Sequence, residues 1–378
     1  MPVEIRKHPI GVGLSDFLGV ADYLFRGDPH YARPLDLDTK DRLSTRNPFF
    51  DHAECALFTA HRNGWCVGRC SAQLDRLHLE RHGDSTGFFG FFDTVDDPEV
   101  ASELLTAAGN WLRERGMKRI RGPLSLNYNE EVGCLVQGFD APAMWLTPHH
   151  RDYQAGLIER AGFTPFQELH AWRVATDDVP EAARSLHDGL ARLPGVSVRH
   201  CNMKEFEVDL RTLLELRDDA RRDSWAFAPY TDRELKRLSE TLKWILIPEL
   251  TYLVHVEGRP AAAALALPNL NELTRDLAGQ LLPLGLPKLL WRLKVSGPKT
   301  FRIALLAVRK EFRALPQFEP LGAMLMIKLK EAGRRSGFQL GEWSWTSADD
   351  PAPEATLRAA GAATITKKYR LYERALTS

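Results

Sequence analysis

One short pattern occurs twice in this chain of 378 residues, and it limits the possible folds more than any other feature. Residues 112–122 contain the end of a charged helix, a glycine and the start of a strand, and residues 333–343 repeat that order. In each half a second helix, glycine and strand follow, over residues 155–174 and 355–373. Two copies of helix–strand–helix–strand predict a duplicated α/β module.

The segments that precede these repeats are also alike. Each half contains a predicted hairpin ahead of these repeats, and the first hairpin turns at Asn63-Gly64, a strong turn signal. A short apolar segment then predicts a buried strand and leads into a helix. The hairpin, strand and helix are expected at 54–74, 87–92 and 96–115 in the first half, and at 251–267, 301–308 and 321–336 in the second.

The chain is long enough for two domains, each with its own core. A stretch rich in Asp, Glu and Pro at 176–181 predicts the boundary. We therefore expect one domain over residues 1–180, beginning with a helix near 14–25, and another over residues 181–378.

Composition excludes several classes of protein. Fifty Lys and Arg residues balance fifty Asp and Glu residues, which argues against a nucleic-acid partner. Five cysteines without C-x-x-C spacing predict neither disulfides nor a metal site. Charged residues interrupt the first 18 positions, so no signal peptide is expected, and no apolar run reaches the ~20 residues of a spanning helix. These features predict a cytoplasmic protein. P-loop, hydrolase-elbow and zincin motifs do not occur.

Hairpin, apolar strand, helix, strand, helix, strand is the order of the GNAT acyltransferase fold. Along most of its length the chain resembles tandem GNAT proteins, and its best-matching stretches resemble a bacterial family that includes bacterial ceramide synthases. The resemblance implies an α/β fold of the α+β type, with two mixed twisted sheets flanked by helices. It also implies an acyl-CoA-dependent N-acyltransferase of sphingolipid biosynthesis, with acyl-CoA as co-substrate and no permanently bound cofactor. The matching stretches lie at 87–92, 96–100, 121–150, 266–271 and 367–373.

A GNAT domain binds the CoA diphosphate with backbone amides where its central strand meets the next helix, in a Q/R-x-x-G-x-G/A loop. In the first half this junction is 93–99, where four acids and Pro98 would repel a diphosphate. We therefore expect no CoA site in the first half, whose junction has the residues of a well-capped helix.

The second half has a stretched form of the same loop. It would comprise Val308, Arg309 and Arg313, followed after an insertion by Gly322 and Ala323. Residues 286–313 contain eight Lys or Arg and one Glu, which suits phosphate groups, although a solvated basic surface would look the same. The contrast with the acidic first half favours CoA in the C-terminal half.

Four residues are candidates for the chemistry. Tyr369 and Tyr372 lie on the last predicted strand, where the resemblance implies a tyrosine that protonates the leaving thiolate. Glu342 near a strand start is a candidate base, and Glu130 in a first-half loop is a further catalytic candidate. Each could equally be an ordinary strand or loop residue.

A dense group of polar residues in the first half predicts the wall of an acceptor pocket. Asx turns and a helix cap are the alternative explanation, and the paired histidines lack a third metal ligand. Asp223 and three residues of the second half are lesser candidates for the same pocket. The residues are Asn127, Asn129, Glu130, Glu131, His149, His150 and Tyr153, with Trp225, Asn269 and Asn271 in the second half.

Residues 281–299 have no counterpart in the first half. Leucines and Trp291 alternate there with Lys and Arg, which predicts an amphipathic helix at the inner membrane surface or beside a lipid tunnel. An ordinary surface helix is the alternative.

Three functions follow from these patterns. The first is transfer of a long acyl chain from acyl-CoA to a sphingoid base such as 3-oxosphinganine. The second keeps acyl transfer but uses an amino acid, a peptide or an aminated small molecule as the amine. The third is a catalytically silent binding protein, which the missing glycines near Arg313 would favour.

Overall fold

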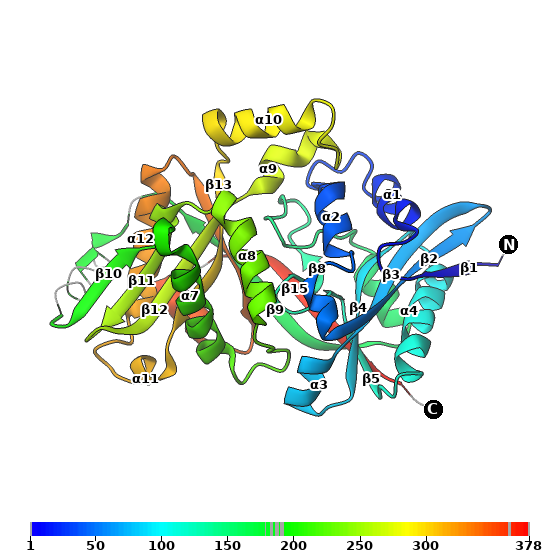
Figure 1. The fold of residues 1–378 in the computed structure, drawn as a ribbon, viewed down its shortest axis with the longest axis horizontal. Helices are drawn as coiled ribbons and strands as arrows, with labels where there is room; N and C mark the ends of the chain where they lie inside the picture. Colours follow the sequence, from blue (N-terminus) through cyan, green and yellow to red (C-terminus); the bar gives the residue numbers. More distant parts are fainter. Residues whose placement is uncertain are drawn as a thin grey trace. The chain divides into compact units, whose positions relative to one another are not determined.

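A computed structural model describes residues 2–177, 179–181, 184–185, 189, 193–361 and 364–376 (Figure 1). The chain divides into two compact units. Unit 1 comprises residues 1–169, 274–291 and 367–378, and unit 2 comprises 170–273 and 292–366. The chain therefore passes from one unit to the other four times, whereas a boundary at 180/181 would require a single passage. One residue of the predicted boundary segment 176–181, residue 178, lies outside the described residues.

Unit 1 has a mixed sheet in the order β1-β2-β3-β4-β5-β15. Its first four strands are antiparallel, β5 is parallel to β4, and the last residues of β15 pair antiparallel with β5. The strands are β1 (Glu4–His8), β2 (Ala53–Arg62), β3 (Trp65–Asp75), β4 (Thr86–Thr94), β5 (Arg119–Gly122) and β15 (Thr364–Ala375). A short ribbon of β6 (Leu124–Ser125) and β7 (Glu131–Val132) stands apart, and β8 (Cys134–Gln137) pairs with β15.

Helices α1 (Leu14–Leu24) and α4 (Pro98–Arg113) both pack on β2, β3 and β4. The apolar side of α4 joins the core of unit 1 together with Phe89 of β4 and Tyr372 of β15. The remaining helices of this unit are α2 (Asp36–Arg42), α3 (Arg76–His82), α5 (Gln154–Arg160) and α10 (Gly285–Trp291).

Unit 2 repeats the plan. Strands β10, β11, β12 and β13 are antiparallel neighbours and β14 is parallel to β13. Helices α7 and α12 both contact β12 and β13 (Figure 1). The strands are β10 (Val196–His200), β11 (Thr251–Val256), β12 (Arg259–Pro268), β13 (Thr300–Val308) and β14 (Leu340–Ser347). The α-helices with defined bounds among the described residues are α7 (Phe206–Arg221), α8 (Asp232–Ile245), α9 (Leu270–Thr274), α11 (Lys310–Arg313), α12 (Leu321–Arg335) and α13 (Ala352–Ala359). Strand β9 (Thr164–Ala175), like β15, has residues in both units.

Each unit has its own hydrophobic core, which explains why the halves of the sequence resemble each other. Hairpins, apolar strands and helices lie where the sequence predicts them, within a few residues. The first hairpin turns at Asn63 and Gly64, both with positive φ, as the primed turns of tight hairpins require.

The parallel strand pairs of the two units share a geometry that bears on function. β4 pairs with β5 only from Thr86 to Phe88, and β13 pairs with β14 only from Thr300 to Ile303. In both units the register against the preceding strand shifts just after this point, so that β4 and β13 each contain a bulge. Strands that separate at a bulge expose backbone in the middle of a sheet, where a ligand can bind.

In unit 1 this opening is filled by the chain itself. A Cβ atom at Gly90 of β4 would lie 2.1 Å from the carbonyl oxygen of Leu124 in β6. Segment 124–126 therefore crosses directly over the bulge of β4.

Within the described residues, no helix has both the length and the apolar character needed to cross a membrane.

Candidate functional site

The N-terminus of α12 in unit 2 is the first candidate site. Its N-cap residue, Pro320, forms no side-chain cap, and Gly322 and Ala323 lie buried in the first turn. A Cβ atom on Gly322 would lie 3.2 Å from the Thr356 hydroxyl, so a glycine suits this close contact. First-turn amides and the positive end of the helix dipole favour an anion here.

The matching helix end in unit 1 is closed. Asp97 caps α4 by accepting hydrogen bonds from the amides of Glu99 (2.9 Å) and Val100 (3.3 Å). Arg62 forms ion pairs with both Asp97 and Glu99. Although partial burial raises the pKa of Asp97, the Arg62 and amide hydrogen bonds outweigh it and lower that pKa below its usual value. A carboxylate already occupies the place that an anion would take.

Arg309 lies between β13 and α11 in unit 2. Its backbone amide donates to the carbonyl of Ala261 at 2.8 Å. Its Nε–H is buried and has no hydrogen-bond partner among the described residues. A buried donor without a partner costs free energy, so this guanidinium suits an anionic ligand. Val308 is buried beside it and Arg313 is exposed at the end of α11.

Helix α11 itself is not an anion site. The carboxylate of Asp219 accepts the Lys310 amide at 2.7 Å, and the Lys310 ammonium pairs with Asp223. Asp223, which the sequence suggested for the acceptor pocket, is engaged in this ion pair. Trp225 lies half-buried two residues further on.

The two predicted tyrosines belong to unit 1. Tyr369 and Tyr372 are fully buried, and the Tyr372 hydroxyl donates to the Glu159 carboxylate at 3.1 Å. We expected both within the C-terminal domain, residues 181–378, whereas residues 367–378 of the last strand belong to unit 1. The hydrogen bond of Tyr372 to Glu159 fits a structural role.

Glu342 lies on β14 in unit 2, 4% exposed and in register with Arg302 of β13. Arg302 is also buried, donates to the hydroxyl and carbonyl of Ser344 at 3.1 Å each, and stacks on Trp345. Sequence reasoning missed Arg302. The signal was a lone arginine inside an otherwise apolar strand, since a buried charge must find partners.

The polar loop of unit 1 forms internal contacts. The Asn127 side chain accepts the Asn129 amide at 2.8 Å, which is an Asx turn. Glu130 and Glu131 both pair with Arg42 of α2, at 2.8 and 3.1 Å. Burial raises the pKa of Glu130 although Arg42 opposes the shift. Arg42 was another residue that sequence reasoning missed, because it lies 88 positions from Glu130.

The following histidines and tyrosine also have protein partners. His150 Nδ1 accepts the Leu135 amide at 3.1 Å, and burial lowers the pKa of His150 to about 4. His149 Nε2 lies 3.1 Å from the Asp28 carboxylate, and burial lowers the pKa of His149. The Tyr153 hydroxyl donates to a backbone carbonyl at 2.9 Å. The described residues contain no cluster that could hold a metal ion.

The asparagines of the second half organise the start of α9. Asn269 is 2% exposed, donates to the Thr300 hydroxyl at 3.0 Å and accepts the Asn271 amide at 3.3 Å. These contacts resemble a helix cap more than a pocket wall.

Comparison with solved structures defines the class of fold. A tandem GNAT protein from the clavulanic acid biosynthesis pathway matches with a TM-score of 0.59 and 13% identity, covering 99% of both chains. A GCN5-related N-acetyltransferase from Sphaerobacter thermophilus matches with a TM-score of 0.56 and 13% identity, over 100% of this chain and 96% of the other. The fold is therefore the tandem GNAT fold.

Sequence comparison then gives the family. The chain is 40% identical over 371 residues to bacterial ceramide synthase of Caulobacter vibrioides, covering 96% of this chain and 95% of the relative. It is 36% identical over 367 residues to protein YghO of Escherichia coli, covering 96% and 92%. No protein-family model matches the chain. The chain belongs to the family of these two proteins, as the sequence motifs predicted.

Proposed function

We propose that this protein is an acyl-CoA-dependent N-acyltransferase that binds acyl-CoA in unit 2. The preferred reaction joins a long acyl chain to the amine of a sphingoid base such as 3-oxosphinganine. Support comes from the GNAT fold and from the 40% identical relative named bacterial ceramide synthase. Acyl-CoA is a co-substrate in this proposal, and no permanently bound cofactor is needed.

The asymmetry of the two helix ends is the observation that carries this assignment. The first turn of α4 is occupied by the Asp97 carboxylate, whereas α12 has no side-chain cap. Arg309 adds a buried donor without a partner among the described residues. A diphosphate would gain amide and guanidinium hydrogen bonds at α12 and would meet repulsion at α4.

The reaction needs a neutral amine, and we assign proton transfer to one carboxylate, that of Glu342. The amine nitrogen attacks the thioester carbonyl, so that a C–N bond forms and the C–S bond breaks. The amine loses one proton and the CoA thiolate gains one. Glu342 is our proposed base because it is a buried carboxylate at the point where β13 and β14 separate. Tyr369 and Glu130 stay catalytic candidates, whereas the hydrogen bond of the Tyr372 hydroxyl to Glu159 favours a structural role for Tyr372.

Peripheral membrane contact through residues 281–299 is part of the proposal. Leu282, Leu284 and Trp291 are 73%, 75% and 64% exposed. The sequence contains no acidic residue from Leu277 to Lys310. Exposed leucine and tryptophan beside basic residues are typical of segments that bind an anionic bilayer, from which a lipid amine would be taken. The Lys294 side chain lies outside the described residues.

A silent binding protein is the second candidate function. The segment 314–320 replaces the compact glycine-rich turn of the family pattern, which favours loss of CoA binding. Acyl transfer to an amino acid, peptide or other amine differs from the first proposal only in the acceptor.

The test has a binding part and a turnover part. We expect palmitoyl-CoA to raise the melting temperature more than acetyl-CoA, and mass spectrometry to detect N-acyl product after addition of 3-oxosphinganine. Arg309→Ala should weaken palmitoyl-CoA binding about tenfold, because a charge-assisted hydrogen bond is lost. Arg259→Ala removes an exposed arginine of the same unit and is the control. Stabilisation by neither CoA ester would favour the silent binding protein.

A further inference from the structure

Arg302 of β13 is a buried charge in unit 2 that the proposed function does not yet use. It is 6% exposed, and Glu342 and Ser344 of β14 are 4% and 1% exposed. The residues that flank Arg302 in β13 belong to the hydrophobic core of the unit, as does Trp343 between Glu342 and Ser344. Because successive residues of a strand point to opposite faces, the three polar side chains share the other face of the sheet. Buried polar groups need partners, so we expect these three to interact with one another.

The Arg302 guanidinium bridges the two strands at the point where they separate. β13 and β14 pair from Thr300 to Ile303, and Ser344 is the first residue of β14 beyond that pairing. Nε of Arg302 donates to the Ser344 hydroxyl and Nη2 donates to the Ser344 carbonyl oxygen, at 3.1 Å each. The guanidinium carbon lies 4.4 Å from the centre of the Trp345 ring. These contacts give the planar guanidinium a defined orientation.

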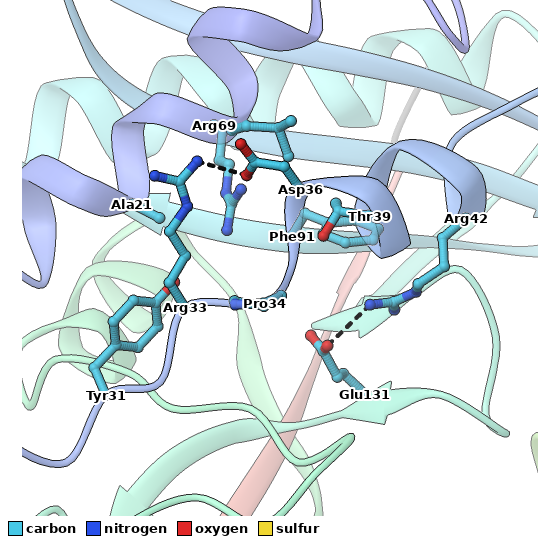
Figure 2. A pocket seen from close by; sticks show the side chains of 11 residues that line it. Ala21, Tyr31, Arg33, Pro34, Asp36, Thr39, Arg42, Arg69, Phe91 and Glu131 are labelled. Carbon is cyan, nitrogen blue, oxygen red and sulfur yellow. Dashed lines mark hydrogen bonds and ion pairs between the residues drawn. The ribbon is translucent and has the colours of Figure 1, made fainter. Parts of the chain in front are cut away.

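A buried arginine of unit 1 shows which contacts such a charge requires. Arg42 is 6% exposed, like Arg302, and Figure 2 shows its guanidinium group turned toward the Glu131 carboxylate. The two groups form an ion pair at 3.1 Å, and the guanidinium also lies 5.3 Å from the centre of the Phe91 ring. An aromatic ring and a carboxylate together compensate the buried charge.

Arg302 has its aromatic ring in Trp345, and Glu342 is placed to be its carboxylate. Arg302 and Glu342 are register partners in adjacent strands, which lie about 4.8 Å apart. Ser344 and Trp345 are neutral, so they do not balance the charge of the guanidinium. A guanidinium this close favours the ionised form of a carboxyl group, and only the ionised form can accept a proton.

The corresponding place in unit 1 has a different chemistry. Counted from the start of the parallel pairing, Arg302 and Glu342 are the third pair of unit 2, whereas Phe88 and Arg121 are the third pair of unit 1. Arg121 pairs with Glu373 at 2.8 Å. At this position a carboxylate therefore occurs in the unit to which we assign acyl-CoA, and an arginine takes its place in the other unit.

We propose that Arg302 is a positioning residue for the proposed base, holding Glu342 as a carboxylate at the point where β13 and β14 separate. The inference rests on the proposed function for the reaction itself, and it adds the residue on which the base depends. When the amine attacks the thioester, the C–N bond forms, the C–S bond breaks and Glu342 accepts the proton that the nitrogen loses. Glu342 then releases this proton to solvent, from which the leaving CoA thiolate gains one. Arg302 keeps its charge and exchanges no proton.

The kinetics of three variants test this inference. Arg302→Met should lower kcat about a hundredfold, the scale of one general base, while palmitoyl-CoA affinity measured by calorimetry stays within about twofold of wild type. Arg302→Lys keeps the charge and should recover about tenfold or more of that loss. Arg121→Met removes an equally buried arginine from unit 1 and is the control, so its kcat should stay within about twofold of wild type although its stability falls.

A double variant separates positioning from a general loss of structure. If Arg302 acts through Glu342, adding Arg302→Met to Glu342→Gln should reduce kcat no further, because the base is already absent. A merely structural role would multiply the two losses. Unchanged kcat in folded Arg302→Met, or multiplied losses in the double variant, would overturn the inference.

The ionisation of Glu342 can be measured without any substrate. In infrared difference spectra against Glu342→Gln at neutral pH, the wild type should show carboxylate bands of Glu342, and Arg302→Met should show the band of a protonated carboxyl group. A protonated Glu342 in the wild type would overturn the inference even if no Arg302 variant folds. A Glu342 carboxylate that depends on Arg302, in a protein that forms no N-acyl product, would contradict the proposed function and leave the ion pair standing. Product formation that Arg302→Met does not slow would do the reverse.

Discussion

Among single residues, His150 shows how burial fixes a protonation state. Burial of the ring lowers its pKa from 6.5 to about 4, the nearby His149 lowers it further, and Asp93 opposes the shift. Between pH 4 and 6.5 the unfolded chain therefore binds more protons than the folded one, so the free energy of unfolding rises with pH in this window. His150 contributes this stability fully above pH 6.5 and loses it as the pH falls toward 4.

We predict that His150→Asn flattens this dependence. Asparagine can accept the Leu135 amide, as His150 does, but does not titrate. Urea unfolding at pH 7 and pH 5 should show a smaller loss of stability for the variant than for wild type, with a maximum difference of roughly 3 kcal/mol at the acid end of the window. Other buried histidines make the free energy of unfolding depend on pH in both proteins. An identical slope in the two proteins would contradict the assignment.

Tyr372 allows a second prediction about a single residue. Its hydroxyl donates to Glu159 inside unit 1, so Tyr372→Phe should lower the free energy of unfolding by about 1 kcal/mol. Measured by steady-state kinetics, kcat should remain within about twofold of wild type. A fall in kcat of a hundredfold or more, with little change in stability, would instead show that the tyrosine protonates the leaving thiolate.

The polar residues of unit 1 show where sequence reasoning about single residues ends. His149 and Glu130 were recognised as unusual because polar groups gather in their loop. Their partners, Asp28 and Arg42, lie 121 and 88 positions away. No local pattern reveals such pairs. The sequence could therefore indicate a polar cluster, but not which of its side chains already have partners within the protein. The Asx turn at Asn127 is local and was foreseen as an alternative.

At the level of helices and strands, local chemistry predicted most of what the structure contains. Asn63-Gly64 fixes a hairpin turn, and Asp97-Pro98 begins α4 as expected, because caps and tight turns depend on neighbouring residues. The bulges of β4 and β13 could not be predicted, since they depend on pairing with other strands. The same is true of the crossing of segment 124–126 over Gly90.

The N-termini of α4 and α12 allow a prediction about single helices. Pro320→Asp would place a capping carboxylate on α12, as Asp97 does on α4, and Pro320→Asn would place a neutral cap of the same shape. Both should stabilise the helix by up to about 1 kcal/mol. Only the aspartate should weaken palmitoyl-CoA binding tenfold or more, measured by calorimetry, because its charge repels the diphosphate. Equal affinities for the two variants would show that no anion binds at this helix.

The matched change in unit 1 is the control. Asp97→Asn keeps a capping group on α4 and removes its charge, so palmitoyl-CoA affinity should stay within about twofold of wild type.

For the molecule as a whole, the sequence did not predict that the last strand belongs to unit 1 and not to the unit that precedes it in the chain. A repeat predicts two similar modules but not which module each strand joins. Residues 367–378 complete unit 1 although they lie at the end of the second repeat. Tyr372 of this strand is part of the unit 1 core, and Tyr372 to Ala375 pair with β5.

Because the last strand belongs to unit 1, we can predict how fragments of the chain unfold. Residues 1–180 alone lack the β15 segment, so they should show no cooperative thermal unfolding by circular dichroism. Joining residues 364–378 to the fragment through a flexible linker should restore a cooperative transition. Cooperative unfolding of 1–180 at the temperature of the full chain would contradict the division into units.

The central claim is that the two modules differ in their ability to accept a diphosphate. A crystal structure with palmitoyl-CoA tests it most directly. We predict density for the diphosphate at the first turn of α12, within hydrogen-bond distance of Arg309. Diphosphate density beside Asp96 and Asp97 at the start of α4, with none near Arg309, would contradict the account.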